Sequence, residues 1–228
     1  MPDLRPSSGQ KLAKLVTRLR WRGPGEVVSL GVQRLREAVS SQEELIVLAR
    51  STGGEIPSST GLTFREATPE DGPRYARDIA TDSASSFRAR LSDRTRCFLV
   101  VAESRLVHAT WMTSAAAWTR EVRAYFRPPP GEAYIYESFT RADVRGRGVY
   151  PFALAGISWW LAGRGLERVW VAVEAHNAPS LKAVSKAGFE EVDRIHYARR
   201  MGLLHVEGPR CPSGEPTSLC LALTPGAM

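Results

Sequence analysis

The chain has 228 residues, of which 43% are hydrophobic, and carries a formal net charge of +7. This length can bury a substantial core without covalent cross-links. The cysteines Cys97, Cys211 and Cys220 show no C-x-x-C spacing and no neighbouring histidines, so the sequence indicates neither a disulfide framework nor a metal site. It contains no run of roughly 20 apolar residues and no secretory signal pattern, and we therefore expect a cytoplasmic protein.

The positive charge is concentrated near the N-terminus, where residues 1–40 hold eight Lys or Arg and three Asp or Glu. Residues 11–22 (KLAKLVTRLRWR) place leucines and a valine at helical spacing between basic residues, which predicts an amphipathic basic helix. This helix could contact an anionic membrane surface, dock an acidic carrier protein or pack on the rest of the chain. No nucleic-acid-binding module accompanies the charge, so we expect no nucleic-acid partner.

A second helix is expected over residues 27–39, and a short strand over residues 43–49. Residues 51–61 (STGGEIPSSTG) are rich in Gly, Ser, Thr and Pro, which is typical of a linker. The predicted division of the chain is a basic helical extension with its linker at 1–60, a catalytic domain at 61–205, and a C-terminal strand or tail at 206–228.

From Leu62 onward the pattern alternates between strands and helices. Thr68, followed by Pro69 and two acidic residues, predicts the start of a helix that runs toward Leu91. The remaining expected elements are a hairpin of 97–102 with 106–113, an irregular loop at 118–131, a strand at 133–140, a helix at 151–162, a strand at 169–173, a helix at 179–187 and one or two final strands before 204. Together they predict an α/β (α+β) fold with a mixed sheet and helices on both faces.

The segment 140–151 (TRADVRGRGVYP) leaves a strand, passes through Gly146 and Gly148, and enters a helix at Pro151. Such a turn directs backbone N–H groups and the positive end of a helix dipole at one point, where a pyrophosphate can bind. A dinucleotide fingerprint would need a third glycine where Pro151 stands, so a Rossmann-type site is disfavoured.

Two signatures resemble the GNAT superfamily of N-acetyltransferases. The run from Arg145 to Val149 is similar to the R-x-x-G-x-G/A acyl-CoA signature of that family, and Asn177-Ala178-Pro179-Ser180 followed by Gly188-Phe189 is similar to its closing helix. The resemblance covers roughly residues 62–204. It implies a mixed, mostly antiparallel central sheet flanked by helices, preceded here by a helical N-terminal extension.

The resemblance also implies the cofactor, acetyl-CoA or another acyl-CoA. Backbone amides near Gly148 would hold its pyrophosphate, the main chain at the end of strand 133–140 would pair with the pantetheine arm, and Asn177 would contact the cofactor or act as an ordinary helix N-cap. The implied cofactor-binding residues are Phe139, Thr140, Arg145, Gly146, Arg147, Gly148, Val149, Tyr150, Asn177 and Ser180.

Two residues depart from the family pattern. Tyr150 stands where the family has Gly or Ala, and Val184 stands where many members have the tyrosine that protonates the leaving thiolate. Either another group fills this role or the reaction proceeds without an acid. Tyr197 on a late strand is the candidate, with a partly buried packing residue as its alternative role.

The predicted general base is Glu137, acting directly or through water, with a structural ion pair as its alternative role. Strand alternation predicts Ile135, Glu137 and Phe139 on one face, with Tyr134, Tyr136 and Ser138 on the other. His176 and His108 are secondary base candidates, and Glu174 is expected near the acceptor.

The predicted function is transfer of an acetyl group from acetyl-CoA to a primary amine of a small molecule, with an amino sugar as the suggested acceptor. The alternatives are an N-acyltransferase that uses a longer acyl-CoA or an acyl-carrier protein, and a non-catalytic acyl-CoA sensor. Formation of a homodimer is left open.

Overall fold

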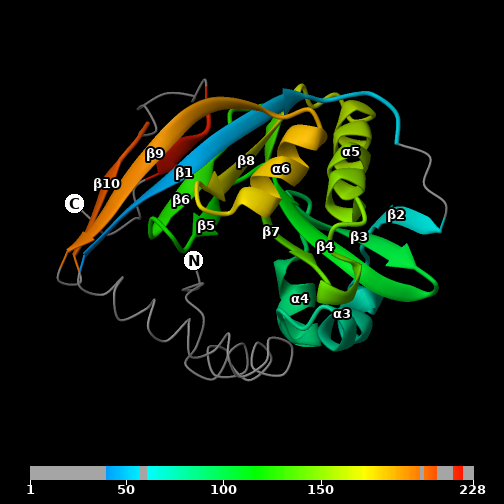
Figure 1. Ribbon diagram of the computed structural model, residues 1–228. Helices are drawn as coiled ribbons and strands as arrows, with labels where there is room; N and C mark the ends of the chain where they lie inside the picture. The colour runs from blue at the N-terminus through cyan, green and yellow to red at the C-terminus, as the bar shows by residue number, and fades with distance from the viewer. Residues whose placement is uncertain (1–39, 57–60, 201–202, 210–217, 223–228) are drawn as a thin grey trace.

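The computed structural model describes residues 40–56, 61–200, 203–209 and 218–222 (Figure 1). The two helices predicted within residues 11–39 lie outside this part of the chain. The described strands are β1 Ser40–Ser51, β2 Leu62–Glu66, β3 Thr95–Ala102, β4 Arg105–Thr113, β5 Ala117–Thr119, β6 Ala124–Arg127, β7 Glu132–Thr140, β8 Arg168–Glu174, β9 Glu190–Arg200, β10 Leu203–Glu207 and β11 Cys220–Ala222. The helices are the short 3-10 turns η1 Pro69–Asp71 and η2 Ala142–Val144, and α3 Gly72–Asp78, α4 Ala84–Arg90, α5 Val149–Ala162 and α6 Ala178–Lys186.

Eight strands form one sheet in the order β10-β9-β1-β8-β7-β4-β3-β2. Among the pairings described, β7 with β8 is the parallel one and the others are antiparallel. The predicted mixed, mostly antiparallel sheet is therefore confirmed. A second sheet of three strands has the order β11-β6-β5.

Strand β1 lies in the interior of the main sheet, between β8 and β9. Its pairing with β8 runs from Leu45 opposite Glu174 to Ser51 opposite Arg168. Residues 40–51 fall within the predicted N-terminal extension, but they form a central strand of the main sheet. The run from Leu45 to Ala49 is buried throughout, as expected for a strand covered on both faces.

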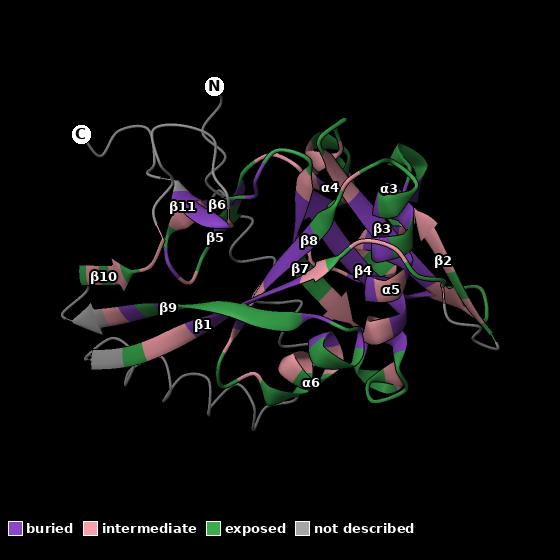
Figure 2. Ribbon diagram, turned by 90° about the horizontal axis from the view of Figure 1, so that it is seen from above, coloured by how far each residue is buried: buried purple, intermediate pink, exposed green. Residues whose placement is uncertain are grey.

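The two faces of the main sheet have different covers. Helices α5 and α6 pack on one face, where Leu154, Leu161 and Val184 join strand residues such as Val171 in a core cluster. We call this the α5 face. Helices α3 and α4 cover part of the opposite face, with Tyr75 and Phe87 against Trp111 of β4, and the small sheet covers the rest. Figure 2 shows α6 on one side of the sheet, and α3, α4 and the small sheet on the other. We call this second side the α3 face.

Two predicted elements differ from the structure. The single helix expected from Thr68 toward Leu91 is divided into η1, α3 and α4, because the chain turns between them with Ala80 at a φ of 59°. The expected loop at 118–131 includes most of β5 and all of β6, which pair with each other, and β6 also pairs with β11 near the C-terminus. Pairing with a strand so far along the chain is not visible in a local pattern. Cys220 on β11 is disulfide-bonded, which its spacing did not indicate.

Candidate active site

The main sheet opens where β7 and β8 stop pairing. Their parallel register runs from Glu132 opposite Arg168 to Ile135 opposite Val171 and ends there, although both strands continue. The open edge of β7 exposes the side chains of Glu137 and Ser138. We call the space between residues 136–140 and 172–174 the gap. Its edge carries backbone N–H and C=O groups that no neighbouring strand of the described sheet uses.

A β-bulge shapes the β7 side of the gap. Ala109 of β4 faces Phe139 and Trp111 faces Tyr136, so Thr110 lies opposite two residues, Glu137 and Ser138. Glu137 has a φ of 48°, a left-handed conformation that costs about 1 kcal/mol for a residue with a side chain. The bulge overturns the simple alternation predicted for this strand. Tyr136 and Glu137 both lie on the α3 face, and Ser138 lies on the α5 face.

The predicted phosphate-binding turn leads from β7 into α5. Gly146 and Gly148 both have a φ of 77°, and a Cβ on either would meet no atom within 4 Å. Glycine is required there by backbone conformation, and the space in front of the turn is open. Within the described residues, the N–H groups of Arg147, Gly148, Val149 and Tyr150 have no backbone acceptor. Four free amides at a helix N-terminus fit a pyrophosphate.

The other predicted cofactor residues lie on both sides of this turn. Arg145 donates from Nε to the carbonyl of Thr140 at 3.1 Å, so it ties the turn to the end of β7. Asn177 is the N-cap of α6, where its side chain accepts from the N–H of Ser180 at 3.3 Å. That contact is the structural alternative recognised from the sequence, and a direct cofactor contact of Asn177 or Ser180 stays a prediction.

A cluster of polar side chains lies at the β8 side of the gap. The Tyr197 hydroxyl donates to Glu174 Oε1 at 3.3 Å, and His176 lies between Glu174 and Glu43, at 3.6 and 3.2 Å. Burial raises the pKa of Glu174, and the nearby charge of Glu121 raises it further, while His176 and Tyr197 lower it. The structure therefore brings two predicted catalytic residues, Tyr197 and His176, to the same carboxylate.

The third predicted catalytic residue, Glu137, lies across the gap and has a different partner. Arg90 of α4 places Nη1 2.8 Å from Glu137 Oε2, and its guanidinium stacks 3.9 Å above the Trp111 ring and 5.6 Å from that of Tyr136. No sequence pattern identified Arg90, because its contacts come from strands far along the chain. The ion pair is the structural alternative considered for Glu137.

A different set of polar groups lies on the α5 face. His108 is fully buried between Thr140 and Thr110, with distances of 2.7 Å from Nδ1 and 2.5 Å from Nε2 to their hydroxyls. Burial lowers the pKa of His108 to about 3, so its ring is neutral at physiological pH. His108 is one of the two secondary candidates for the general base. Its ring is buried and both of its nitrogens are hydrogen-bonded, so it links Thr140 to Thr110.

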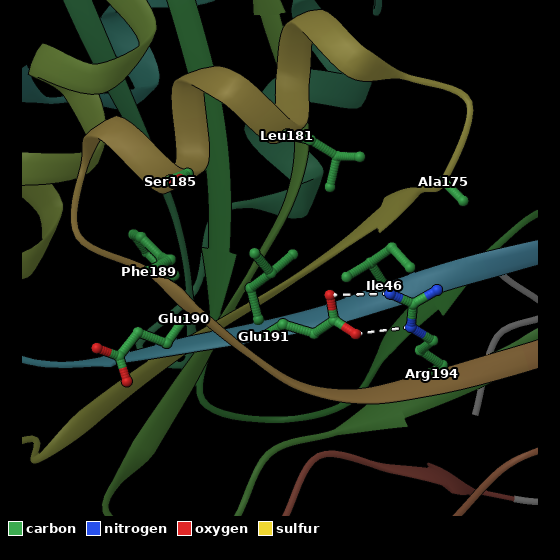
Figure 3. Close-up of a pocket in the computed structure, with 9 residues that line it drawn as sticks. Ile46, Ala175, Leu181, Ser185, Phe189, Glu190, Glu191 and Arg194 are labelled. Atoms are coloured by element: carbon green, nitrogen blue, oxygen red, sulfur yellow. Dashed lines mark hydrogen bonds and ion pairs between the residues drawn. The ribbon is translucent and has the colours of Figure 1, made fainter.

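A groove of about 560 Å³ lies between α6 and strands β1 and β9 (Figure 3). Its floor is apolar, and an ion pair of Arg194 with Glu191, 2.6 Å long, lies at its rim. None of the predicted site residues lines it. The lining residues are Ile46, Leu48, Ala175, Leu181, Ser185, Phe189, Glu190, Glu191 and Arg194.

Comparison with known proteins identifies the family of the chain. The family model described as the acetyltransferase (GNAT) family matches residues 64–189, more than half of the chain. The chain belongs to the GNAT acetyltransferase family. The GNAT match begins at β2, and so leaves out β1, although β1 lies inside the GNAT sheet.

Individual relatives are more distant. A mycothiol acetyltransferase from Clavibacter michiganensis is 30% identical in an alignment of 178 residues that covers 74% of this chain and 56% of that protein. The chain thus spans little more than half the length of this curated relative. A GCN5-related N-acetyltransferase from Sphaerobacter thermophilus superposes with a TM-score of 0.55 at 14% identity, over 74% of this chain and 54% of that one. Another from Kribbella flavida has a TM-score of 0.50 at 14% identity, over 77% and 62%. The two structures support the fold.

Within the described residues, no helix is long and apolar enough to cross a membrane.

Proposed function

We propose that this GNAT protein transfers an acetyl group from acetyl-CoA to a primary amine of a small molecule. The observation that carries the proposal is the gap between β7 and β8, which lies beside a turn with four free backbone amides. A phosphorylated thioester donor held at the turn could extend along the unpaired edge of β7. When bound, acetyl-CoA would supply the activated acetyl group.

The residues of this chain fit such a donor. The amides of residues 147–150 and the guanidinium groups of Arg145 and Arg147 suit the pyrophosphate. The backbone of Phe139 and Thr140 suits the amide groups of the pantetheine arm, as in addition of a strand to a sheet edge. The amides at the bulge suit the thioester carbonyl oxygen, where negative charge develops during attack.

Glu174 is the stronger candidate for the general base. Its pKa is raised above the usual glutamate value by burial, and a base works best when its pKa lies near the working pH. Tyr197 and His176 hold its carboxylate at the end of β8. The role of Glu137 as base remains a prediction. It is the weaker candidate because accepting a proton would break its ion pair with Arg90.

The α3 face near the gap suits a cationic acceptor. Glu137 lies on one side of the gap and Glu174 on the other. Tyr136 packs against both core clusters of the α3 face. An ammonium group would be attracted by the carboxylates, and the ring of Tyr136 offers an apolar surface to a sugar or aliphatic body. The relative named mycothiol acetyltransferase supports a small-molecule acceptor, and an amino sugar remains our suggestion.

The test is release of free thiol from acetyl-CoA in the presence of a panel of amines that includes amino sugars, aminoglycosides and amino acids. We expect turnover with at least one small amine and slower turnover with hexanoyl-CoA. Acetyl-CoA binding without turnover on any amine would favour the sensor alternative. Faster reaction with hexanoyl-CoA or an acyl-carrier protein would favour the longer-chain alternative.

A further inference from the structure

Five polar side chains form a connected series on the α5 face, which runs from the end of β7 through β4 to the first turn of α5. Thr140 contacts His108 at 2.7 Å, His108 contacts Thr110 at 2.5 Å, and Thr110 donates to Ser138 at 3.1 Å. Burial raises the pKa of Tyr150, and a hydrogen bond with the Ser138 hydroxyl lowers it in part; the centroid of the Tyr150 ring lies 5.3 Å from that of the His108 imidazole. His108 and Thr110 are fully buried, so each of their polar atoms needs its partner.

The chemistry of these groups fixes the direction of every hydrogen bond in the series. A neutral imidazole has one N–H donor and one acceptor nitrogen. Thr110 gives its hydrogen to Ser138, so its oxygen accepts from Nε2–H of His108, and Nδ1 therefore accepts from Thr140. Ser138 already accepts from Thr110 and has its own hydrogen to give to the oxygen of Tyr150. Each member donates toward Tyr150.

The last member of this series keeps a hydrogen that it can donate. The Tyr150 oxygen accepts from Ser138, and in the described part of the chain no other residue accepts its O–H. Tyr150 is partly buried, and its neighbour Ser138 is exposed at the open edge of β7. The end of the series that Ser138 and Tyr150 form therefore lies beside the gap, on the same face as the phosphate-binding turn.

We propose that Tyr150 is the general acid, and that its hydroxyl protonates the sulfur that leaves when the thioester is cleaved. This inference rests on the proposed function. The amine nitrogen attacks the carbonyl carbon and forms the C–N bond, the C–S bond breaks with its electron pair on sulfur, and the Tyr150 proton moves to that sulfur. The phenolate accepts its hydrogen bond from Ser138 and regains a proton from water once the thiol has left. The amine's proton goes to the base.

The faces of the sheet on which the two tyrosines lie favour Tyr150 over Tyr197 as the general acid. The donor is held from the α5 face, where α5 begins, so the sulfur leaves toward that face. Tyr197 packs with the small sheet on the α3 face, and its proton is directed at Glu174. Val184, at the position where many GNAT members have a tyrosine, is fully buried and apolar. Base and acid would thus act from opposite faces of the sheet.

The test compares Tyr150→Phe with the wild-type protein, and its first measurement needs no acceptor amine. A hydroxyl that donates to sulfur stabilises the thiolate, so CoA bound to the wild-type protein should have a lower thiol pKa than CoA bound to the variant. We expect a difference of about one unit, read from thiolate absorbance in the ultraviolet during a pH titration. Calorimetry should give acetyl-CoA affinities that agree within about twofold. Turnover with the best amine of the panel should fall about 100-fold.

Two further variants control for loss of packing. Tyr75→Phe removes another buried hydroxyl, which is bonded to Thr81 and Trp111 under α3, and should change neither the thiol pKa nor turnover. Thr110→Val breaks the series at a positioning residue and should lower kcat without changing KM, and Thr110→Ser should restore it. An unchanged thiol pKa and unchanged turnover in Tyr150→Phe would overturn the inference and leave the proposed function intact. A wild-type protein that binds no acetyl-CoA would overturn both.

Discussion

The hydroxyl of Tyr197 lies 3.3 Å from Oε1 of Glu174, although β1 separates the two strands that carry these residues. The contact crosses the middle strand of a three-strand unit, and it holds the carboxylate at the end of β8, where the sheet opens. A carboxylate fixed at that point can accept a proton from an amine that enters the gap.

Replacing Glu174 with Gln should lower kcat by about 100-fold or more, because the amide cannot accept the proton of the attacking amine. Affinity for acetyl-CoA should stay the same, because Glu174 lies on the α3 face of the sheet and the phosphate-binding turn lies on the α5 face. Glu137→Gln is the matched variant and should have the smaller effect. A larger defect in Glu137→Gln, measured in the same thiol-release assay, would make Glu137 the base.

The pH profile of kcat/KM should show an acidic limb that belongs to Glu174. Its pKa is raised by burial and by Glu121, and a base is active when deprotonated, so the rate should rise as the pH rises through that pKa. The hydrogen bond from Tyr197 lowers this pKa, so Tyr197→Phe should move the limb to higher pH. A change confined to the basic limb would instead support Tyr197 as the acid.

Gly148→Ala should weaken acetyl-CoA binding at least tenfold, because the new Cβ would occupy the open space in front of the turn. Gly165→Ala is a matched control: Gly165 also has a positive φ, 72°, with open space around it, but it follows α5. Both variants should lose roughly 1 kcal/mol of stability from backbone strain. Calorimetric titration with acetyl-CoA and thermal melting separate the two effects, and equal affinities for both variants would contradict the assignment of the turn.

His108 should make the protein less stable as the pH falls. Its folded-state pKa of about 3 lies below the ordinary value of 6.5, so between these limits the unfolded chain binds a proton that the folded chain does not. The loss should approach about 1.4 kcal/mol per pH unit well below 6.5. Urea unfolding of the wild type and of His108→Gln at pH 7 and pH 5 should show a steeper loss for the wild type. Parallel losses would show that His108 gains a proton in the folded protein.

Deletion of residues 1–60, at the boundary predicted from the sequence, should abolish cooperative folding, because it removes β1 from between β8 and β9. Deletion of residues 1–39 keeps β1 and should preserve a cooperative thermal transition and acetyl-CoA binding. Circular dichroism melts of both proteins provide the measurement. A folded protein that starts at residue 61 would show that the remaining strands can close the sheet without β1.

Features specified by neighbouring residues were predictable from the sequence. The helices at 149–162 and 178–186 each have a proline in the first turn and a glycine after the end. The turn between β7 and α5 is indicated by Gly146 and Gly148. The strands β3, β4, β7 and β8 follow from apolar and β-branched runs. The family signatures lie within this same stretch, so the fold and the family were predictable together.

Features that depend on distant pairing were not predictable. The position of β1 depends on its pairing with strands near residues 168–200, and the small sheet depends on β11 near the C-terminus. The bulge at Glu137 results from an extra residue opposite Thr110, which nothing in the strand's own sequence indicates. For that reason the faces of Glu137 and Ser138 were assigned incorrectly, and the partners Arg90 and Thr110 were missed.

The interior place of β1 also bears on the order in which the molecule can assemble. During synthesis β1 leaves the ribosome before both of its neighbours, and its apolar residues from Leu45 to Ala49 stay without their partners until β8 and β9 have been made. Contacts between such distant segments slow folding, because the long loop between them must close first. The half of the sheet that carries His176 and Tyr197 should therefore be the last part of the protein to become ordered, and the carboxylate of Glu174 the last of these side chains to be held in place.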